Sequence, residues 1–333
     1  TDLLRKVVVA IRQEIVSLGG EVRFHAAAED IIAKDGKITG VIAQGEEISC
    51  DCLILAPGNA ARPLFTCSME RGIAIEAKPF SVGARIEHPQ EAIDHAMYGD
   101  YAGHPKLGHA EYQLSERETD TGRAVYTFCM CPGGVVVPAA SERETIVTNG
   151  MSYHARSGKN ANAAVVVSVG AEDFGNDPRR AIAFQRELET NAYQAGRAGG
   201  AYAAPAENVR SFLEGRGELH IGTVEPTYDR GVVAADLGAL LPGELADTLR
   251  AGLRAYERKI AGYTAPDAVL TGLETRTSSP VRLKREEDLE SAQLAGLYPC
   301  GEGAGYAGGI MSAAVDGLRV ARAIIGRYRP AEG

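Results

Sequence analysis

The sequence lacks several features that would place it in a specialised class of proteins. It has no run of about 18 apolar residues, so it predicts no transmembrane helix. Lysine and arginine are not clustered, and the formal net charge is −9, which argues against nucleic acid or an anionic membrane as a partner. An RNA-binding module is disfavoured further, because aromatic and basic residues are not interleaved. Internal repeats and low-complexity tracts are also absent.

Cysteine is sparse as well. The six cysteines stand at positions 50, 52, 67, 129, 131 and 300, too few in a chain of 333 residues for a disulfide scaffold. This usage predicts free thiols and a cytoplasmic location. Structural zinc normally takes four ligands, commonly with C-x₂₋₄-C spacing, and the two C-x-C pairs do not match this pattern. We therefore expect no metal site.

The composition indicates a folded core, and the first residues of the chain indicate a helix. Apolar residues make up 45% of the chain, enough for one large core or two smaller ones. Residues 3–18 carry apolar side chains at helical spacing, with Asp2 as a possible cap and Gly19-Gly20 as a stop. The chain begins inside this helical pattern without an initiator methionine, which suggests an N-terminally truncated protein.

The remaining pattern predicts an α/β (α+β mixed) fold. Strands are expected at 21–25, 31–33, 38–43, 53–56, 124–130, 135–138, 145–149, 164–169 and 296–299. Helices are expected at about 177–199, from about 242 to 260, and at about 309–325. The second of these carries Leu245, Leu249, Leu253, Tyr256 and Ile260 on one face. The middle of the chain is the more β-rich part. We therefore expect three segments, 1–80, 81–265 and 266–333, in which the first and last form one α/β layer around an inserted domain.

A glycine-rich turn, Gly301–Gly309, lies between an expected strand and an expected helix. Residues 303–308 match G-x-G-x-x-G, but the chain ends after the helix and provides no second strand with an acidic ribose ligand. Two interpretations remain open. The turn could bind an anion or cofactor at the helix N-terminus, or it could be a tight packing turn before a helix rich in small residues.

Six stretches, taken together and in order, carry a family resemblance. They are LILAPGNAAR (53–62), RGIAIEAKPFSVGARIEHPQ (71–90), FCMCPGGVVVPAASE (128–142), VTNGMSYHAR (147–156), ETRTSSPVR (274–282) and GLYPCGEGAGYAGGIMSAAVDG (296–317). The chain resembles a widespread bacterial family of FAD-dependent dehydrogenases, whose fold is similar to that of glutathione-reductase-like flavoproteins. The resemblance implies an incomplete FAD/NAD(P)-binding-type α/β domain with an inserted β-rich substrate domain, lacking the N-terminal ADP-binding βαβ segment.

The resemblance also implies a set of FAD-binding residues. Ala28 would contact the adenine through its backbone, and Pro57, Gly58 and Asn59 would lie where the chain crosses into the inserted domain. Glu302 would lie near the ribitol or pyrophosphate, within a second contact that comprises Gly301, Glu302, Gly303, Ala304, Gly305, Gly308 and Gly309. Backbone N–H groups of Gly309, Ile310 and Met311 would face the flavin pyrimidine edge, where the helix dipole stabilises negative charge.

Cys129 and Cys131 are candidates for catalysis. If they lie on a regular strand, both thiols share one face, and one of them could approach the flavin or the substrate. The alternative is that they are buried strand thiols that act as small hydrophobic side chains. Cys50 and Cys52 are interpreted as packing residues. Cys300 could lie near the flavin or belong to the core.

His154 and Arg276 are further catalytic candidates. His154 could transfer protons near neutral pH, or be a solvated loop residue. Arg276 could hold an anionic substrate or the flavin N1 region, or pair with Glu274 in a surface turn.

The expected function is that of an FAD-dependent oxidoreductase acting on an unknown small organic substrate, with NAD(P)H or another electron donor as a possible partner. The alternative is a non-catalytic folded fragment that does not bind FAD by itself. On either interpretation, residues 1–333 alone are expected to be inactive.

Overall fold

The computed structural model describes residues 2–118 and 121–328. Their contacts divide the chain into two compact units. Among the described residues, unit 1 contains 2–17, 81–118, 121–168 and 186–275, and unit 2 contains 18–80, 169–185 and 276–328. The domain boundaries at residues 80 and 265, which were expected from sequence, stay a prediction.

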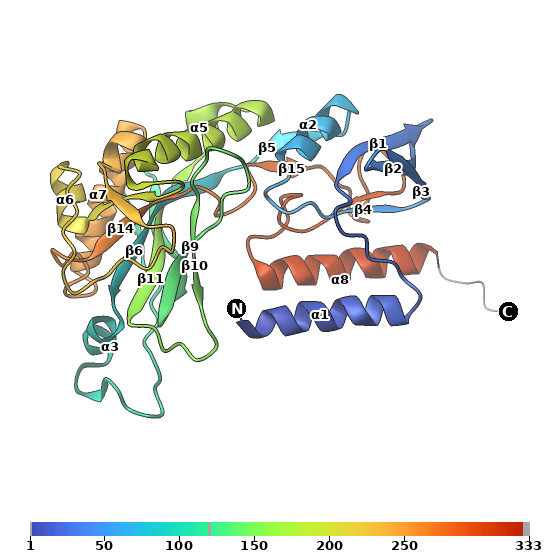
Figure 1. The fold of residues 1–333 in the computed structure, drawn as a ribbon. Coiled ribbons are helices and arrows are strands. Elements are labelled where there is room, and N and C mark those ends of the chain that lie inside the picture. Colours follow the sequence, from blue (N-terminus) through green and yellow to red (C-terminus); the bar gives the residue numbers. More distant parts are fainter. Residues whose placement is uncertain (1, 119–120, 329–333) are drawn as a thin grey trace. The chain divides into compact units, whose positions relative to one another are not determined.

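Both helices and strands are found throughout the described part of the chain, which makes the fold a mixed α/β one (Figure 1). The helices are α1 (Asp2–Ser17), α2 (Arg62–Glu70), α3 (Gln90–Tyr98), α4 (Ala171–Phe174), α5 (Pro178–Gly196), α6 (Val209–Glu214), α7 (Gly243–Glu257) and α8 (Ile310–Arg327). The strands are β1 (Ala28–Lys34), β2 (Lys37–Ala43), β3 (Glu46–Ser49), β4 (Leu53–Leu55), β5 (Ile75–Ala77), β6 (Phe80–Pro89), β7 (Ser115–Arg117), β8 (Ala124–Cys131), β9 (Gly134–Pro138), β10 (Thr148–Ser152), β11 (Asn160–Val169), β12 (Ala204–Asn208), β13 (Val232–Ala234), β14 (Val269–Glu274), β15 (Val281–Leu283) and β16 (Leu297–Pro299).

A seven-stranded, mostly antiparallel sheet organises unit 1, in the order β13-β12-β14-β6-β11-β8-β7. Two of its inner strands, β6 and β11, are buried over almost their whole length. They approach each other so closely that a Cβ atom on Gly83 would lie 1.9 Å from the Val165 carbonyl oxygen. A separate hairpin of β9 and β10 completes the β structure of this unit.

Helix α7 supplies much of the apolar packing in unit 1. Leu245, Leu249, Leu253 and Tyr256 lie at helical spacing and are all buried, as their pattern predicts. A Cβ atom on Gly252 would lie 2.5 Å from the Val125 side chain, so the helix contacts β8 through a residue without a side chain. The 3.6-residue period therefore assigns this face of α7 correctly from sequence.

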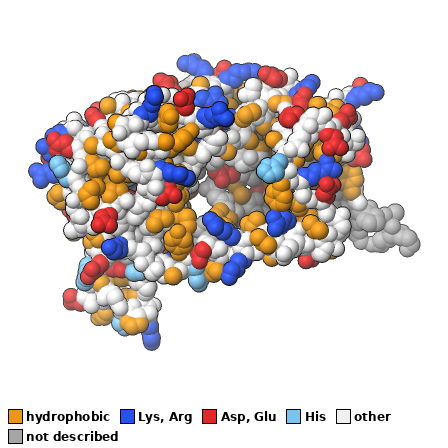
Figure 2. Space-filling view, in the orientation of Figure 1, with side chains coloured by type: hydrophobic (Ala, Val, Ile, Leu, Met, Phe, Trp, Pro, Cys, Tyr) orange, Lys and Arg blue, Asp and Glu red, His pale blue; other side chains and the backbone are white. Residues whose placement is uncertain are grey.

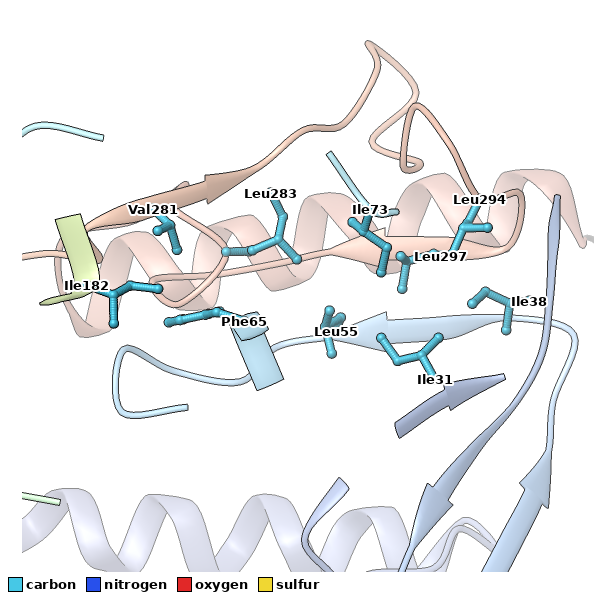
Figure 3. Close-up of a cluster of buried hydrophobic side chains, with 11 residues drawn as sticks. Ile31, Ile38, Leu55, Phe65, Ile73, Ile182, Val281, Leu283, Leu294 and Leu297 are labelled. Atoms are coloured by element: carbon cyan, nitrogen blue, oxygen red, sulfur yellow. The ribbon is translucent and has the colours of Figure 1, made fainter. Parts of the chain in front are cut away.

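Unit 2 is built around a parallel pair of short strands, β4 and β16. The antiparallel meander β1-β2-β3 and the pair β5–β15 accompany this pair. Figure 3 shows the shared core, in which side chains from the first and last parts of the sequence meet. Its buried members are Ile31, Ile38, Leu55, Phe65, Ile73, Ile182, Val281, Leu283, Leu294, Leu297 and Ala304.

Two predicted strands differ from the observed structure. Residues 21–25 are irregular, because no strand in the described part of the chain pairs with them, and an isolated extended segment has no backbone partners. The strand expected at 145–149 is observed as β10, three residues later, where its partner β9 fixes the register. The other predicted strands fall within or overlap observed ones.

Charge is distributed rather than concentrated on the surface that Figure 2 shows, where basic and acidic side chains are interspersed. Within residues 2–118 and 121–328, no helix combines the length and apolarity needed to cross a bilayer. Helix α1 has no buried residue, and Val8 and Ile11 are among its exposed apolar side chains.

Candidate functional site

The loops after β4 and β16 meet at one edge of unit 2. Because these strands are parallel, their carboxyl ends point the same way, and such edges are where open α/β sheets bind ligands. The loops are Pro57–Asn59 after β4 and Gly301–Gly309 after β16. Asn59 Nδ2 donates a 2.6 Å hydrogen bond to Glu302 Oε1, so the structure brings together two segments predicted separately from sequence.

A glycine contact holds these loops together. A Cβ atom on Gly303 would lie 2.0 Å from the Gly58 carbonyl oxygen, so only glycine fits at position 303 without displacing that backbone. The buried Ser279 hydroxyl donates to the Gly303 carbonyl oxygen at 3.0 Å. Three chain segments thus meet at Gly303, through a close backbone contact with Gly58 and a hydrogen bond from the Ser279 side chain.

Glu302 is the acidic group of this edge. Its side chain is half-buried, and this burial raises the pKa of Glu302 although Asn59 and the positive charge of Lys78 act in the opposite direction. Lys78 donates to the Ser278 hydroxyl at 3.1 Å, and burial together with the charge of Arg282 lowers the pKa of Lys78. The edge therefore offers a fixed acceptor beside cationic groups, a combination suited to hydroxyl and phosphate groups.

The N-terminus of α8 lies open beside this edge. Ile310 and Met311 are 67% and 75% exposed, and the first-turn N–H groups of a helix have no intrahelical acceptor. The Ser312 hydroxyl accepts from Gly308 N at 3.2 Å and donates to Gly309 O at 3.0 Å, which fixes the turn before the helix. An anionic group would find N–H donors and the positive end of the helix dipole here.

The glycine-rich turn combines the two interpretations that the sequence left open. Ala304 is fully buried, and its carbonyl accepts from Leu283 N, so this part of the turn packs against β15. Gly305 adopts a φ of 89°, and a Cβ atom there would lie 2.7 Å from the Val281 carbonyl oxygen. The packing half is therefore 303–305, and the open half is 308–311.

Ala28 and Pro57, two further predicted contacts, line one cavity of about 340 Å³ within unit 2. Its other walls are mainly apolar and include Val41, Ile48 and Leu55. A planar, weakly polar group suits such a lining. The structure thus places Ala28 and the β4 loop around one space.

A buried ion pair fixes the start of the turn. Arg285 Nη2 and Nη1 donate to the two carboxylate oxygens of Asp316 at 2.6 and 3.0 Å, and Gly301 N donates to the same carboxylate at 2.8 Å. Burial alone would raise the pKa of Asp316, but the bonds from Arg285 and Gly301 outweigh it and hold the pKa below its ordinary value. The pair was not predicted from sequence.

We expect Asp316→Asn to lower the free energy of unfolding at pH 7 by about 3–5 kcal/mol, because it leaves the Arg285 charge buried and unpaired. The pKa of Asp316 is lower in the folded protein than in the unfolded chain. Its contribution is therefore present above an unfolded pKa of about 3.9 and is lost as the pH falls through the folded value. Urea titrations at pH 7 and pH 3 should show the difference shrinking in acid; equal stabilities at pH 7 would refute the assignment.

Unit 1 contains a second polar centre around Arg85 of β6, whose side chain is fully buried. Its Nη2 atom donates to Glu274 Oε1 and to Asn149 Oδ1, both at 3.0 Å, and Nε donates to the other Glu274 oxygen. Its Nη1 atom donates to Cys129 O at 2.8 Å and to Asn162 Oδ1 at 3.1 Å. Burial lowers the pKa of Arg85, but the Glu274 carboxylate outweighs it, so the guanidinium stays charged.

The Cys129-x-Cys131 pair lies beside this cation, on a bulge. Phe128 pairs with Ala164 and Cys131 with Asn162, so two residues of β8 oppose one of β11. The expectation of a regular strand with both thiols on one face is therefore wrong: Cys129 is exposed with a φ of 47°, whereas Cys131 is buried. A hydrogen bond from Cys131 lowers the pKa of Cys129 to about 5, and raises the pKa of Cys131.

The other two catalytic candidates lie elsewhere. His154 is exposed in a turn of unit 1, and its backbone N–H donates to Asp2 Oδ1 at 2.8 Å. Arg276 belongs to unit 2 and is only 9% exposed. The alternative of a surface turn at Glu274–Arg276 is wrong, because both ends are buried and Glu274 binds Arg85. Cys129, Cys131 and His154 share unit 1, and Arg276 does not.

Sequence reasoning missed the charged residues of β6 and β14, Arg85 and Glu274. A charge inside or at the end of a short β-type run is the signal that could have identified them, since a charged residue that is buried needs a partner. Among the residues that the structure describes, no group of three or more His, Cys, Asp or Glu side chains is placed to hold a metal ion.

Comparison with known proteins gives one family. Residues 79–277 match the family described as "FAD-dependent protein, C-terminal domain-like". An uncharacterized protein of Clostridium beijerinckii is 48% identical over 329 residues, which are 98% of this chain and 61% of that protein. The chain therefore spans about three fifths of the length of this curated relative.

Solved structures resemble the chain only weakly. The crystal structure of CtdE in complex with FAD has a TM-score of 0.31 at 12% identity, covering 93% of this chain and 56% of that one. An oxidoreductase from Methanosarcina mazei has a TM-score of 0.38 at 14% identity, covering 95% and 53%. Scores this low carry no argument about function.

Proposed function

Because the chain belongs to the FAD-dependent protein, C-terminal domain-like family, with FAD as its cofactor, we propose that it forms the C-terminal part of a flavoprotein oxidoreductase. FAD supplies the electron transfer when it is bound. The protein provides the binding groups, their orientation and the surrounding charge. In this proposal unit 2 holds the cofactor and unit 1 handles a small organic substrate.

The observation that carries the proposal is the junction of the two strand-end loops in unit 2. The Asn59–Glu302 hydrogen bond and the Gly58–Gly303 contact set an acceptor at a parallel strand edge. The exposed N-terminus of α8 lies in the same turn. A carboxylate acceptor and a free helix N-terminus match the hydroxyl and anionic groups of a dinucleotide.

Each part of this edge has a role in the proposal. The apolar cavity beside Ala28 and Pro57 would receive the adenine. Glu302, oriented by Asn59, would accept from a sugar or ribitol hydroxyl. The N–H groups of Ile310 and Met311 would stabilise negative charge on the reduced ring.

The finer features of the proposal are supported by the resemblance to FAD-dependent dehydrogenases. They are a glutathione-reductase-like architecture, an ADP-binding βαβ unit in the N-terminal part of a longer protein, a dehydrogenase reaction, a cytoplasmic location and an electron donor such as NAD(P)H. Cys129, Cys131, His154 and Arg276 remain proposed catalytic residues.

An absorption spectrum tests the proposal. The longer protein and residues 1–333 are each incubated with excess FAD, desalted and scanned in the visible region. We expect the longer protein to retain stoichiometric flavin, and residues 1–333 to retain less, because only part of the dinucleotide would be held. A longer protein that purifies without flavin and cannot be reconstituted would overturn the proposal. A colourless 1–333 beside a yellow longer protein would establish the alternative, a folded fragment that does not bind FAD by itself.

A further inference from the structure

The two thiols at the β8 bulge differ in environment although they are two residues apart. Cys129 is exposed and lines a cavity of about 480 Å³ together with Glu111, Gln113 and Met130. Cys131 is buried, and its Sγ atom lies 3.3 Å from the Cys129 carbonyl oxygen. One thiol is therefore open to a small molecule, and the second lies behind it, out of reach of that molecule.

A fixed positive charge stands beside the pair. Arg85 reaches the Cys129 carbonyl oxygen at 2.8 Å, and its remaining N–H groups are held by Glu274, Asn149 and Asn162. The guanidinium cannot turn away without breaking several buried hydrogen bonds. Such a cation stabilises a thiolate, the reactive form of cysteine. The lowered pKa of Cys129, caused first by the hydrogen bond from Cys131 and also by Arg85, agrees with this geometry.

The two cysteine side chains lie close enough to interact, because a hydrogen bond joins Cys131 to the Cys129 side chain. In a regular strand, residues i and i+2 have Cα atoms about 6.6 Å apart, which is within the range that a disulfide spans. Cys129 also adopts a φ of 47°, a left-handed conformation that is unfavourable for a non-glycine residue and clusters at functional sites.

Cys50 and Cys52 show that the spacing alone does not create this arrangement. Both are partly buried in unit 2, and burial raises the pKa of each thiol. Their neighbour Asp51 is negative and acts in the same direction on Cys50. Cys50 and Cys52 thus serve as a control pair within the same chain, with the same spacing but with surroundings that raise the pKa of both thiols.

We propose that Cys129 and Cys131 form a thiol–disulfide exchange centre that reduces a low-molecular-weight disulfide. The Cys129 thiolate attacks one sulfur of R–S–S–R, which forms a mixed disulfide and releases one R–S⁻. Cys131 then loses its proton to solvent and attacks Cys129 Sγ, which forms the Cys129–Cys131 disulfide and releases the second R–S⁻. The dithiol is oxidised by two electrons and the small disulfide is reduced by two, with no requirement for FAD.

The first test uses the intact reduced protein and an excess of 5,5′-dithiobis(2-nitrobenzoate) or oxidised glutathione. We expect release of two equivalents of small thiol from this pair, with an internal 129–131 disulfide found by peptide mapping. Cys131→Ser should stop at the mixed disulfide on Cys129, and Cys129→Ser should lose the fast reaction. The double variant Cys50→Ser/Cys52→Ser should react like the wild type.

A second measurement needs no variant, and so holds even if a substitution impairs folding. The rate of iodoacetamide alkylation at Cys129, followed by peptide mass, should change little between pH 6 and pH 8. Alkylation of an ordinary thiol, with a pKa of about 8.5, becomes about 75-fold faster over this range, because the thiolate fraction rises by that factor. The charged and titratable groups that face Cys129 are Cys131 on β8, Arg85 on β6, Glu274 on β14, and Glu111 and Tyr112 in the segment before β7.

Two outcomes would overturn the proposal. In the first, Cys129 alkylation rises with pH like that of an ordinary thiol. In the second, an internal disulfide forms at 50–52 in preference to 129–131. Both measurements are made without added FAD, so their failure would leave the proposed flavin function unaffected.

Discussion

Arg85→Met should lower the free energy of unfolding of unit 1 by about 3–5 kcal/mol, the effect expected when one partner of a buried ion pair is removed. The methionine fills similar space but leaves the Glu274 carboxylate buried, with its cation gone. It also removes the Arg85 N–H groups that donate to the oxygen atoms of Asn149, Asn162 and the Cys129 carbonyl. Denaturant titration followed by circular dichroism is the measurement.

Two matched variants show whether the loss of stability comes from the buried ion pair. Arg210→Met breaks the exposed ion pair with Glu214 and should cost at most about 1 kcal/mol, since surface pairs contribute little. Arg85→Met/Glu274→Met removes both charges and should recover much of the lost stability. If the double variant were less stable than Arg85→Met, the ion pair would not be the source of the effect.

Gly303→Ala should impair both folding of unit 2 and FAD binding. The added methyl group would lie 2.0 Å from the Gly58 carbonyl oxygen, and a backbone oxygen cannot rotate away as a side chain can. Overpacking of this kind typically costs about 1–3 kcal/mol. Separation of the loops also breaks the Asn59–Glu302 arrangement, so FAD affinity should fall by at least about tenfold, equivalent to 1.4 kcal/mol. Thermal unfolding and FAD titration of the longer protein measure the two effects.

Gly317→Ala is the control for Gly303→Ala. Position 317 lies inside α8, and a Cβ atom there meets nothing within 4 Å. Alanine in a helix interior is favoured over glycine by roughly 0.5–1 kcal/mol, so this variant should be at least as stable as the wild type. A Gly303→Ala protein as stable as Gly317→Ala would contradict the close contact between the loops.

Periodicity predicted what depends on local pattern. The first helix and the buried face of α7 follow the 3.6-residue repeat, and both were identified from sequence. The strand β16 and the helix α8 were identified on the two sides of the glycine-rich turn. The turn at 301–309 was recognised because glycine clusters have few structural uses. Residues 303–305 of this turn pack against β15 and Gly58, whereas residues 308–311 are open to solvent. Sequence could not show this difference, because β15 and Gly58 are distant from the turn along the chain.

The central strands of unit 1 could not be predicted in the same way. The strands β6 and β14 carry three buried charged residues, Arg85, Glu87 and Glu274, among apolar and small polar ones, which obscures the strand pattern. These charges are tolerated because partners from other strands satisfy them, and partner positions are not visible in a single sequence. The different exposure of Cys129 and Cys131 was missed for a related reason, since a bulge is decided by the register of two strands rather than by one of them.

The near-complete burial of β6 and β11 has a consequence for motion within unit 1. Backbone amides in strands of this kind exchange hydrogen with solvent mainly through openings that approach global unfolding, whereas exposed elements exchange through small local openings. Arg85 is carried by β6, and Asn162 by β11. The cation beside Cys129 is therefore carried by strands whose amides should exchange most slowly in the unit. Arg85 should stay in place when a molecule binds. Any adjustment to that molecule must then come from Cys129 and the loop side of its cavity.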